Sequence, residues 1–159
     1  MTKLFLSLHV LAAVLAIGPV TVAASLFPAV LRRADGDPND SEALSTLQIL
    51  HRICRVYAVV GLAVPVLGFA TASSLGVLGS GWLIASIVLT AAAAAILALL
   101  ILPAQDSVVS AARTPASGRG LTAGRPSARR LALWAGLFNL LWATVTVLMV
   151  VRPGSTTGA

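Results

Sequence analysis

The chain contains an apolar run, residues 4–31, that is long enough to cross a lipid bilayer. The hydrocarbon core of a bilayer is about 30 Å thick, and a helix needs roughly 20 residues to span it. Three further apolar segments, residues 56–72, 82–102 and 131–151, come near to or reach this length. Because backbone groups in lipid must find their hydrogen bonds within a helix, the four segments predict an all-α, polytopic membrane protein.

The connections between these segments predict how the helices are arranged. The second and third segments are joined by "SSLGVLGSG", which is short and uncharged and therefore favours antiparallel neighbours. Asp40 or Ser41 is a suitable N-cap for a second helix that starts before the membrane and enters it near Val56. We therefore expect an antiparallel up-down bundle in a single domain, residues 1–152, with helices at about residues 4–31, 42–72, 82–102 and 131–151.

The sequence predicts irregular structure in two further stretches. Residues 103–130 are rich in Pro, Gly, Ser and Arg, which predicts a flexible, basic cytoplasmic loop. The end of the chain, "RPGSTTGA", predicts a disordered tail over residues 153–159.

The charge of the chain is informative about topology. Charged residues make up only 10% of the sequence and the mean hydropathy is +0.96, which is typical of membrane proteins. The formal charge of +6 would suggest nucleic acid in a soluble protein, but here the arginines lie beside or between apolar segments. We therefore expect the lipid bilayer as partner and no nucleic acid.

The distribution of Lys and Arg predicts the orientation. Two loops on one side of the membrane, residues 32–55 and 103–130, contain nine of these residues, and the other side has two, Lys3 and Arg152. Under the positive-inside rule, both loops are cytoplasmic and both termini lie outside a bacterial cytoplasmic membrane. The nine residues are Arg32, Arg33, Arg52, Arg55, Arg113, Arg119, Arg125, Arg129 and Arg130.

The alternative for the first segment is a cleaved signal peptide. Lys3 precedes the apolar run, and "VAAS" offers Ala23 and Ala24 near a cleavage site. A signal peptide begins with its N-terminus in the cytoplasm, and its apolar part should not continue as far as Leu31. The sequence therefore favours a retained helix.

Small and polar residues within the apolar segments indicate tight packing of the helices. Gly61 and Gly68 allow close approach of the second helix, and Asn139 is expected to bond to a carbonyl or hydroxyl group of a neighbour. Pro19 and Pro65 should bend their helices or open a carbonyl to another partner. No carboxylate lies at membrane depth, which argues against a proton-coupled transporter.

His9 is the candidate ligand of the chain. It lies near the outer boundary of the first helix, at the same expected depth as Met149 near the end of the fourth. A His nitrogen and a Met thioether suit haem iron or Cu(I). The alternative is a neutral histidine bonded to a backbone or hydroxyl group, with Met149 as packing.

His51 lies on the cytoplasmic side, too far from His9 to share a metal with it. At helical spacing it groups with Gln48, Arg52 and Arg55 in a polar face, and we interpret this face as a contact with anionic lipid head groups through Arg52 and Arg55. The single cysteine, Cys54, has no assigned role. Residue patterns for nucleophilic, acid–base or phosphate chemistry are missing from the sequence.

At "LHVLAAVLAIGP" and "LHRICRVY" the chain resembles a family of small bacterial predicted integral membrane proteins of unknown function. That family is distantly related to the membrane domain of copper-resistance protein D, and relatives such as the HemJ-type protoporphyrinogen oxidases are associated with haem. The resemblance implies the four-helix fold and a ligand role for His9. Copper-handling relatives are expected to carry more Met and His on the outer side, so the resemblance supports the fold more than copper transport or oxidase activity.

The sequence as a whole favours a non-enzymatic membrane component that acts through contacts with lipid, with copies of itself or with another membrane protein. The alternative is a redox or transport protein that binds haem b or copper through His9. We do not expect an enzyme. The third alternative, an enzyme that acts on a lipophilic substrate, would need a polar cleft between the helices.

Overall fold

The computed structural model describes residues 2–37, 39–113 and 127–153, and over these ranges it contains helices and no strand. The helices are α1 (Thr2–Gly36), α2 (Ser41–Val60), α3 (Ala63–Leu75), α4 (Gly81–Ala95), the π-helix η1 (Ile96–Ile101), α5 (Leu102–Arg113) and α6 (Ala128–Val151).

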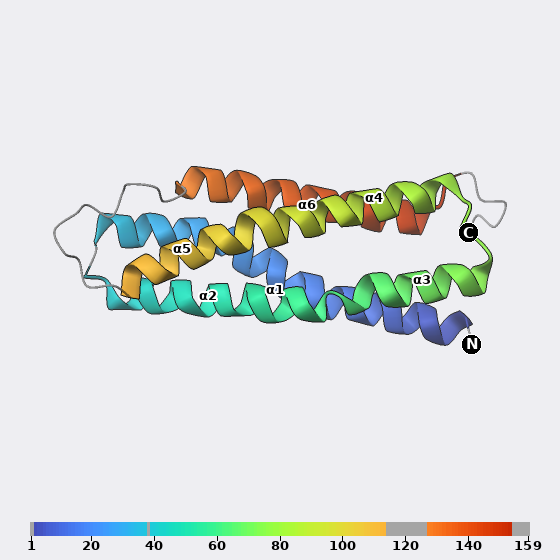
Figure 1. Cartoon of the computed structure of the whole chain (residues 1–159), viewed down its shortest axis with the longest axis horizontal. Helices are drawn as coiled ribbons and strands as arrows, with labels where there is room; N and C mark the ends of the chain where they lie inside the picture. Colours follow the sequence, from blue (N-terminus) through green and yellow to red (C-terminus); the bar gives the residue numbers. More distant parts are fainter. Residues whose placement is uncertain (1, 38, 114–126, 154–159) are drawn as a thin grey trace.

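The helices form four segments that are long and apolar enough to cross a membrane: Lys3–Gly36, Ser41–Leu75, Gly81–Ala112 and Ala128–Val151. The predicted all-α membrane fold with four crossings is therefore confirmed. The segments run up and down along one long axis, so that α1 begins and α6 ends at the same end of the bundle (Figure 1). The α1–α2 connection lies at the opposite end, which we call the loop end; the other is the terminal end.

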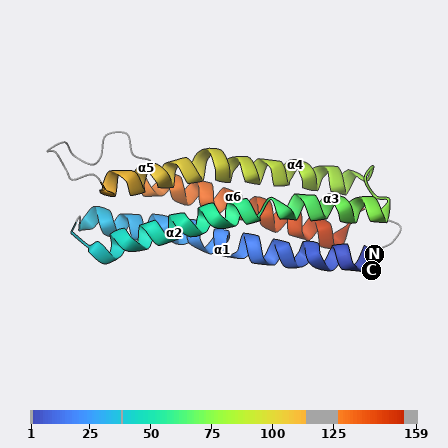
Figure 2. The ribbon, with the colours of Figure 1, turned by 60° about the horizontal axis from the view of Figure 1, so that its bottom comes forward.

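α1 is the central helix of the packing. It contacts α2 and α3 along one side and α6 along another, while α4 packs against α6 and α5 against α2 (Figure 2). The largest hydrophobic cluster lies towards the loop end, where Phe27, Leu47, Ile101 and Leu131 are each at most 2% exposed. In lipid this packing stabilises the bundle through van der Waals contact, because burial from water no longer drives helices together.

The second membrane segment is interrupted near Pro65, where the sequence predicts a bend or a carbonyl opened to another partner. α2 ends at Val60, Gly61 and Leu62 form a turn, and α3 resumes at Ala63. Pro65 has no N–H to offer the carbonyl four residues before it, Gly61 O, and this oxygen accepts from Val64 N at 3.0 Å instead. The backbone at the break thus stays hydrogen-bonded by tighter i→i−3 contacts.

The third membrane segment is longer than predicted. We expected the helix to end at Leu102, before Pro103, but η1 widens the backbone and α5 continues to Arg113. A π-turn, in which Leu102 N donates to Leu97 O, accommodates the proline without ending the helix. The prediction of an irregular loop is therefore wrong for residues 103–113.

The other boundaries differ by a few residues. α1 continues to Gly36, past Pro19 and Pro28, and α6 begins at Ala128 because Ser127 caps it through Arg130 N. The middle of the predicted basic loop, residues 114–126, and most of the predicted tail, residues 154–159, lie outside the described residues.

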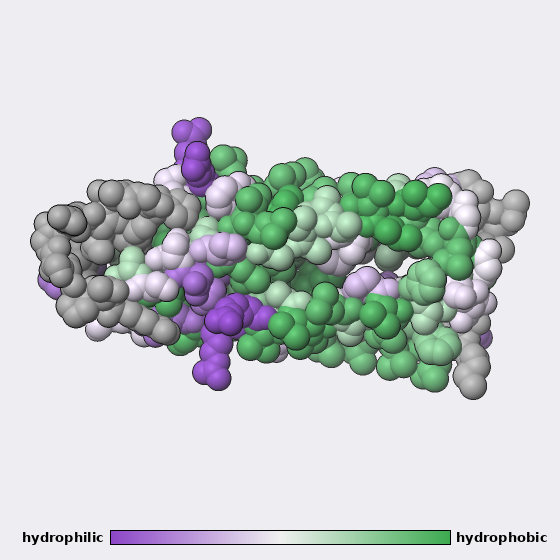
Figure 3. Space-filling view, viewed as in Figure 1, coloured by the Kyte–Doolittle hydropathy of each residue, from purple (hydrophilic) through white to green (hydrophobic). Residues whose placement is uncertain are grey.

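The surface divides along the long axis. Figure 3 shows an apolar zone from the middle of the molecule towards the terminal end, a hollow between α3 and α4 in that zone, and charged residues gathered towards the loop end. The second segment has 35 residues, or about 50 Å of helix, which exceeds the roughly 30 Å hydrocarbon core. The charged end therefore projects beyond the hydrocarbon.

Asp40 fixes the corner between α1 and α2. Its Oδ1 accepts from Ala43 N at 2.9 Å and caps α2, and its Oδ2 accepts from Arg33 Nε at 2.6 Å. The bond from the backbone of Ala43, and then the Arg33 guanidinium, hold the pKa of the Asp40 carboxyl below its ordinary value.

We predict that this corner is weakened by acid. Because the pKa of Asp40 is lower in the folded chain, its contribution to stability is full above the ordinary pKa of an aspartate, about 3.9, and is lost as the pH falls through the lowered value. Asp40→Asn keeps a good N-cap but cannot titrate, so it should remove this acid dependence. Thermal unfolding in detergent between pH 3 and 6 measures the effect, and an equal acid dependence in the variant would contradict it.

Candidate functional site

The buried polar side chains of the described residues are the candidates for a role beyond helix packing. They lie along the whole bundle, and the two histidines among them are far apart on the long axis. They are His9, His51, Thr71, Ser86 and Gln105.

His9 on α1 lies against α3, near the terminal end. Its ring is 7% exposed, and its Nδ1 lies 2.9 Å from the carbonyl oxygen of Val64. Because a carbonyl oxygen can only accept, Nδ1 carries the proton and donates it. A neutral ring then has its lone pair on Nε2.

Gly68 makes room for this ring. A Cβ at position 68 would lie 2.9 Å from His9 Cε1 and 3.3 Å from His9 Nδ1, closer than side chains tolerate. Gly68, predicted as a packing glycine, is therefore where the imidazole contacts the backbone of α3. Gly61 differs, because a Cβ there would meet only Tyr57 O and the Ala58 carbonyl of its own segment, at 3.1 Å or more.

Met149 lies at the same end of the bundle, on the last turns of α6, and is half-buried. Its backbone carbonyl accepts from Arg152 Nε at 3.3 Å, and the Arg152 guanidinium sits 5.9 Å from the centre of the Trp82 ring on α4. These contacts join the ends of α4 and α6. The hydrogen bond and the close backbone contact of His9 are both with α3, so ligation by His9 and Met149 together stays a prediction.

A second polar cluster joins α2 to α5. His51 Nδ1 lies 3.3 Å from Gln105 Oε1, and Gln105 Nε2 donates to Cys54 Sγ at 3.6 Å. Gln105 and Cys54 are fully buried, and His51 is 7% exposed. His51 therefore faces the interior, and our interpretation of it as part of a face on lipid head groups is wrong.

Asp106 completes this cluster from the surface of α5. Its Oδ1 lies 3.4 Å from His51 Nε2, within reach of an ion pair, but without the alignment of a hydrogen bond. Only the histidine is buried, since the Asp106 side chain is 63% exposed. We call His51, Cys54, Gln105 and Asp106 the α2–α5 cluster.

Sequence reasoning missed this cluster because it placed Gln105 and Asp106 in a loop. A signal was present: Ala104, Val108 and Val109 recur at helical spacing, and all are buried in α5. Pro103 hid this signal, since a proline inside a helical pattern is normally read as its end.

Asn139 on α6 bonds to α1 near the middle of the bundle. Its Nδ2 donates to Ser25 Oγ at 2.9 Å, and its Oδ1 is buried without a hydrogen-bond partner in the described structure. Such amide-to-hydroxyl bridges hold membrane helices together, at roughly 1 kcal/mol each.

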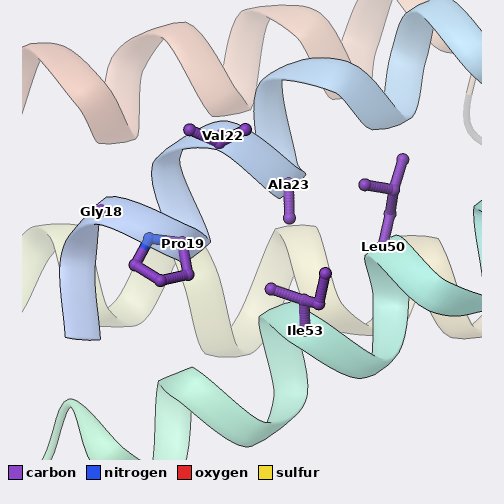
Figure 4. Close-up of a pocket in the computed structure, with 6 residues that line it drawn as sticks. All are labelled: Gly18, Pro19, Val22, Ala23, Leu50 and Ile53. Atoms are coloured by element: carbon purple, nitrogen blue, oxygen red, sulfur yellow. The ribbon is translucent and has the colours of Figure 1, made fainter. Parts of the chain in front are cut away.

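Two cavities lie between the membrane segments, and the smaller one is at the level of the α2–α3 break. One, of about 90 Å³, is lined by residues from all four membrane segments, among them Tyr57, Pro65, Thr90 and Trp142. The other, of about 370 Å³, lies between α1 and α2 (Figure 4). It is lined by Gly18, Pro19, Val22, Ala23, Leu50 and Ile53.

The larger cavity offers hydrocarbon contacts only. Ligand sites in proteins combine apolar walls with a few polar groups that orient the ligand, and the side chains lining this cavity supply none. Its chemistry suits an acyl chain of the surrounding lipid more than a polar substrate.

Comparison with known proteins agrees with this description of a membrane bundle. Residues 3–153 match the family described as predicted integral membrane protein (DUF2269). The chain belongs to this family. No curated protein and no solved structure matches the chain.

Membership of the DUF2269 family covers all four membrane segments, and the described part of the chain contains no group of three or more His, Cys, Asp or Glu that could hold a metal ion. Arg52 and Arg55 are exposed on α2 towards the loop end, and their contact with lipid head groups stays a prediction.

We predict that Gly68→Ala destabilises the protein more than Gly61→Ala. The new methyl group at position 68 displaces the His9 ring and its bond to Val64, which should cost roughly 1–3 kcal/mol of unfolding free energy. Unfolding of the two variants in the same detergent measures the difference. Equal stability would show that the ring does not need this close approach.

Proposed function

We propose that the protein is a non-enzymatic membrane component that works through contacts of its helices with lipid, with copies of itself or with another membrane protein. The observation that carries this proposal is that polar side chains in the apolar zone form hydrogen bonds between helices of the same chain. His9 bonds to the Val64 carbonyl and Asn139 to Ser25, so each bridges two helices of the same chain. The surface left over in that zone is apolar and suits lipid or another helix (Figure 3).

A second candidate function is binding of haem b or copper at His9, for electron transfer or transport. The supporting observation is the Nδ1 bond to Val64 O, because metal-ligating histidines commonly donate one ring nitrogen to a carbonyl and bind metal with the other. His9 Nε2 would be the ligating atom. Met149, at the same end of the bundle, would supply a soft thioether.

The two candidates are separated by the visible spectrum and metal content of the protein, purified in mild detergent after expression with haem and copper supplied. We expect a colourless protein with copper far below one atom per chain. His9→Ala should lower the thermal unfolding temperature, because it removes a bridge between α1 and α3, without changing the spectrum.

His51→Ala is the matched control, since His51 is equally buried but lies towards the loop end. A Soret band or stoichiometric copper that is lost in His9→Ala and kept in His51→Ala would overturn the non-enzymatic proposal in favour of the second candidate.

We further propose that the protein lies in a bacterial cytoplasmic membrane with both termini outside and the loop end in the cytoplasm. The excess of Lys and Arg around the loop end supports this orientation. Exposed Arg52 and Arg55 would then contact anionic head groups of the inner leaflet.

Single cysteines test the orientation in a Cys54→Ala background. Gly79→Cys, in the α3–α4 turn, should react with a membrane-impermeant maleimide in intact cells. Asn39→Cys, in the α1–α2 turn, should react only after permeabilisation. A Cβ at position 79 has open space around it, and Asn39 is exposed, so neither change disturbs the packing. The reverse labelling pattern would invert the proposed topology.

A further inference from the structure

The ring of His51 lies between two oxygen atoms of α5. Gln105 is oriented by Cys54, which accepts from its Nε2, so its Oε1 faces His51 Nδ1. On the other side of the ring, Asp106 Oδ1 faces Nε2. An amide oxygen and a carboxylate oxygen both accept hydrogen bonds.

A neutral imidazole cannot satisfy both sides. With its single proton on Nδ1, the lone pair of Nε2 faces a carboxylate 3.4 Å away, and two acceptors repel each other. With protons on both nitrogens, the ring donates to Gln105 and attracts Asp106. We propose that His51 is a proton-binding site that holds α5 against α2 when protonated and loosens α5 when the proton leaves.

Asp106 is the charged group that faces this ring from across the interface. Among the neighbouring segments, α1 carries no titratable side chain between His9 and Arg32, and α6 carries none between Arg130 and Arg152. The stretches that form α3, α4 and η1 carry none at all.

The titratable groups on α2 itself are Glu42 in its first turn, which is bonded to Arg33, Cys54, which is bonded to Gln105, the half-buried Tyr57 and the exposed Arg52 and Arg55. The proton on His51 is therefore balanced by one carboxylate, that of Asp106.

Two features of the fold would couple protonation of His51 to the position of α5. The cluster joins α2 to α5, which both reach the loop end (Figure 1), and its Asp106 side chain is exposed, so the proton can exchange with water on that side of the membrane. α5 is joined to α4 through η1, whose π-type hydrogen bonds allow a change of direction more readily than a regular α-helix does. Imidazole is the side chain that ordinarily changes charge near neutral pH, so the experiment compares pH values on both sides of neutrality.

Cys54 is a built-in reporter of this contact. It is the only cysteine of the chain and is 0% exposed, so it reacts only when the helices part. The experiment measures its alkylation by N-ethylmaleimide in the full chain in detergent, as the rate in the native protein divided by the rate in the denatured protein at the same pH. This ratio removes the intrinsic pH dependence of the thiol.

We expect the ratio to rise tenfold or more between pH 5.5 and 8.0 in the wild-type protein. His51→Gln and Asp106→Asn should both give a ratio independent of pH, since the first cannot titrate and the second can pair with a neutral ring. His9→Gln is the matched control and should keep the rise.

A flat wild-type ratio would overturn the proposal, because it would mean that the Gln105 amide is turned and the network is satisfied by a neutral ring. A rise that survives in Asp106→Asn would overturn it as well. Asp106 is exposed, so this variant should fold even where His51→Gln does not. The test holds whether or not the protein binds a cofactor.

Discussion

The backbone of this protein has to keep its hydrogen bonds in a solvent that offers none. An unsatisfied backbone group in hydrocarbon costs several kcal/mol, so a proline in a membrane helix must be compensated nearby. The structure does this in two opposite ways. Before Pro65 the helix tightens into i→i−3 bonds, and before Pro103 it widens into a π-helix. The course of the second and third membrane segments follows from these two adjustments.

Polar side chains then tie these segments together at different levels. His9 joins α1 to α3, Asn139 joins α6 to α1, and Gln105 joins α5 to α2. The ties differ in what they respond to. An amide bonded to a hydroxyl is insensitive to pH, whereas the α2–α5 cluster contains an imidazole and a carboxylate. The proposed ligand site at His9 thus lies near the terminal end, and the proposed proton-binding site at His51 lies towards the loop end.

The membrane class and the number of crossings could be predicted from sequence because they depend on the length of the apolar segments, which can be counted in the sequence. The prediction of a helix end at Pro103 was wrong, because a π-turn leaves no mark in hydropathy. His51 illustrates the same limit. Its neighbours along the helix, Arg52 and Arg55, suggested a solvent-exposed surface, but its hydrogen-bonding partner lies on α5, some 50 residues away in the sequence. Contacts between distant segments of this kind cannot be read from spacing along one helix.

The π-helix has a rotational consequence as well. A regular helix turns by about 100° per residue, and a π-turn holds one residue more than an α-turn, so it resets the angular phase of everything that follows. If residues Ile96–Ile101 wound as a regular α-helix without losing a residue, α5 would be rotated by about 100° relative to α4. Gln105 would then leave the face that meets Cys54. The wide winding of η1 is therefore what directs this face of α5 towards α2.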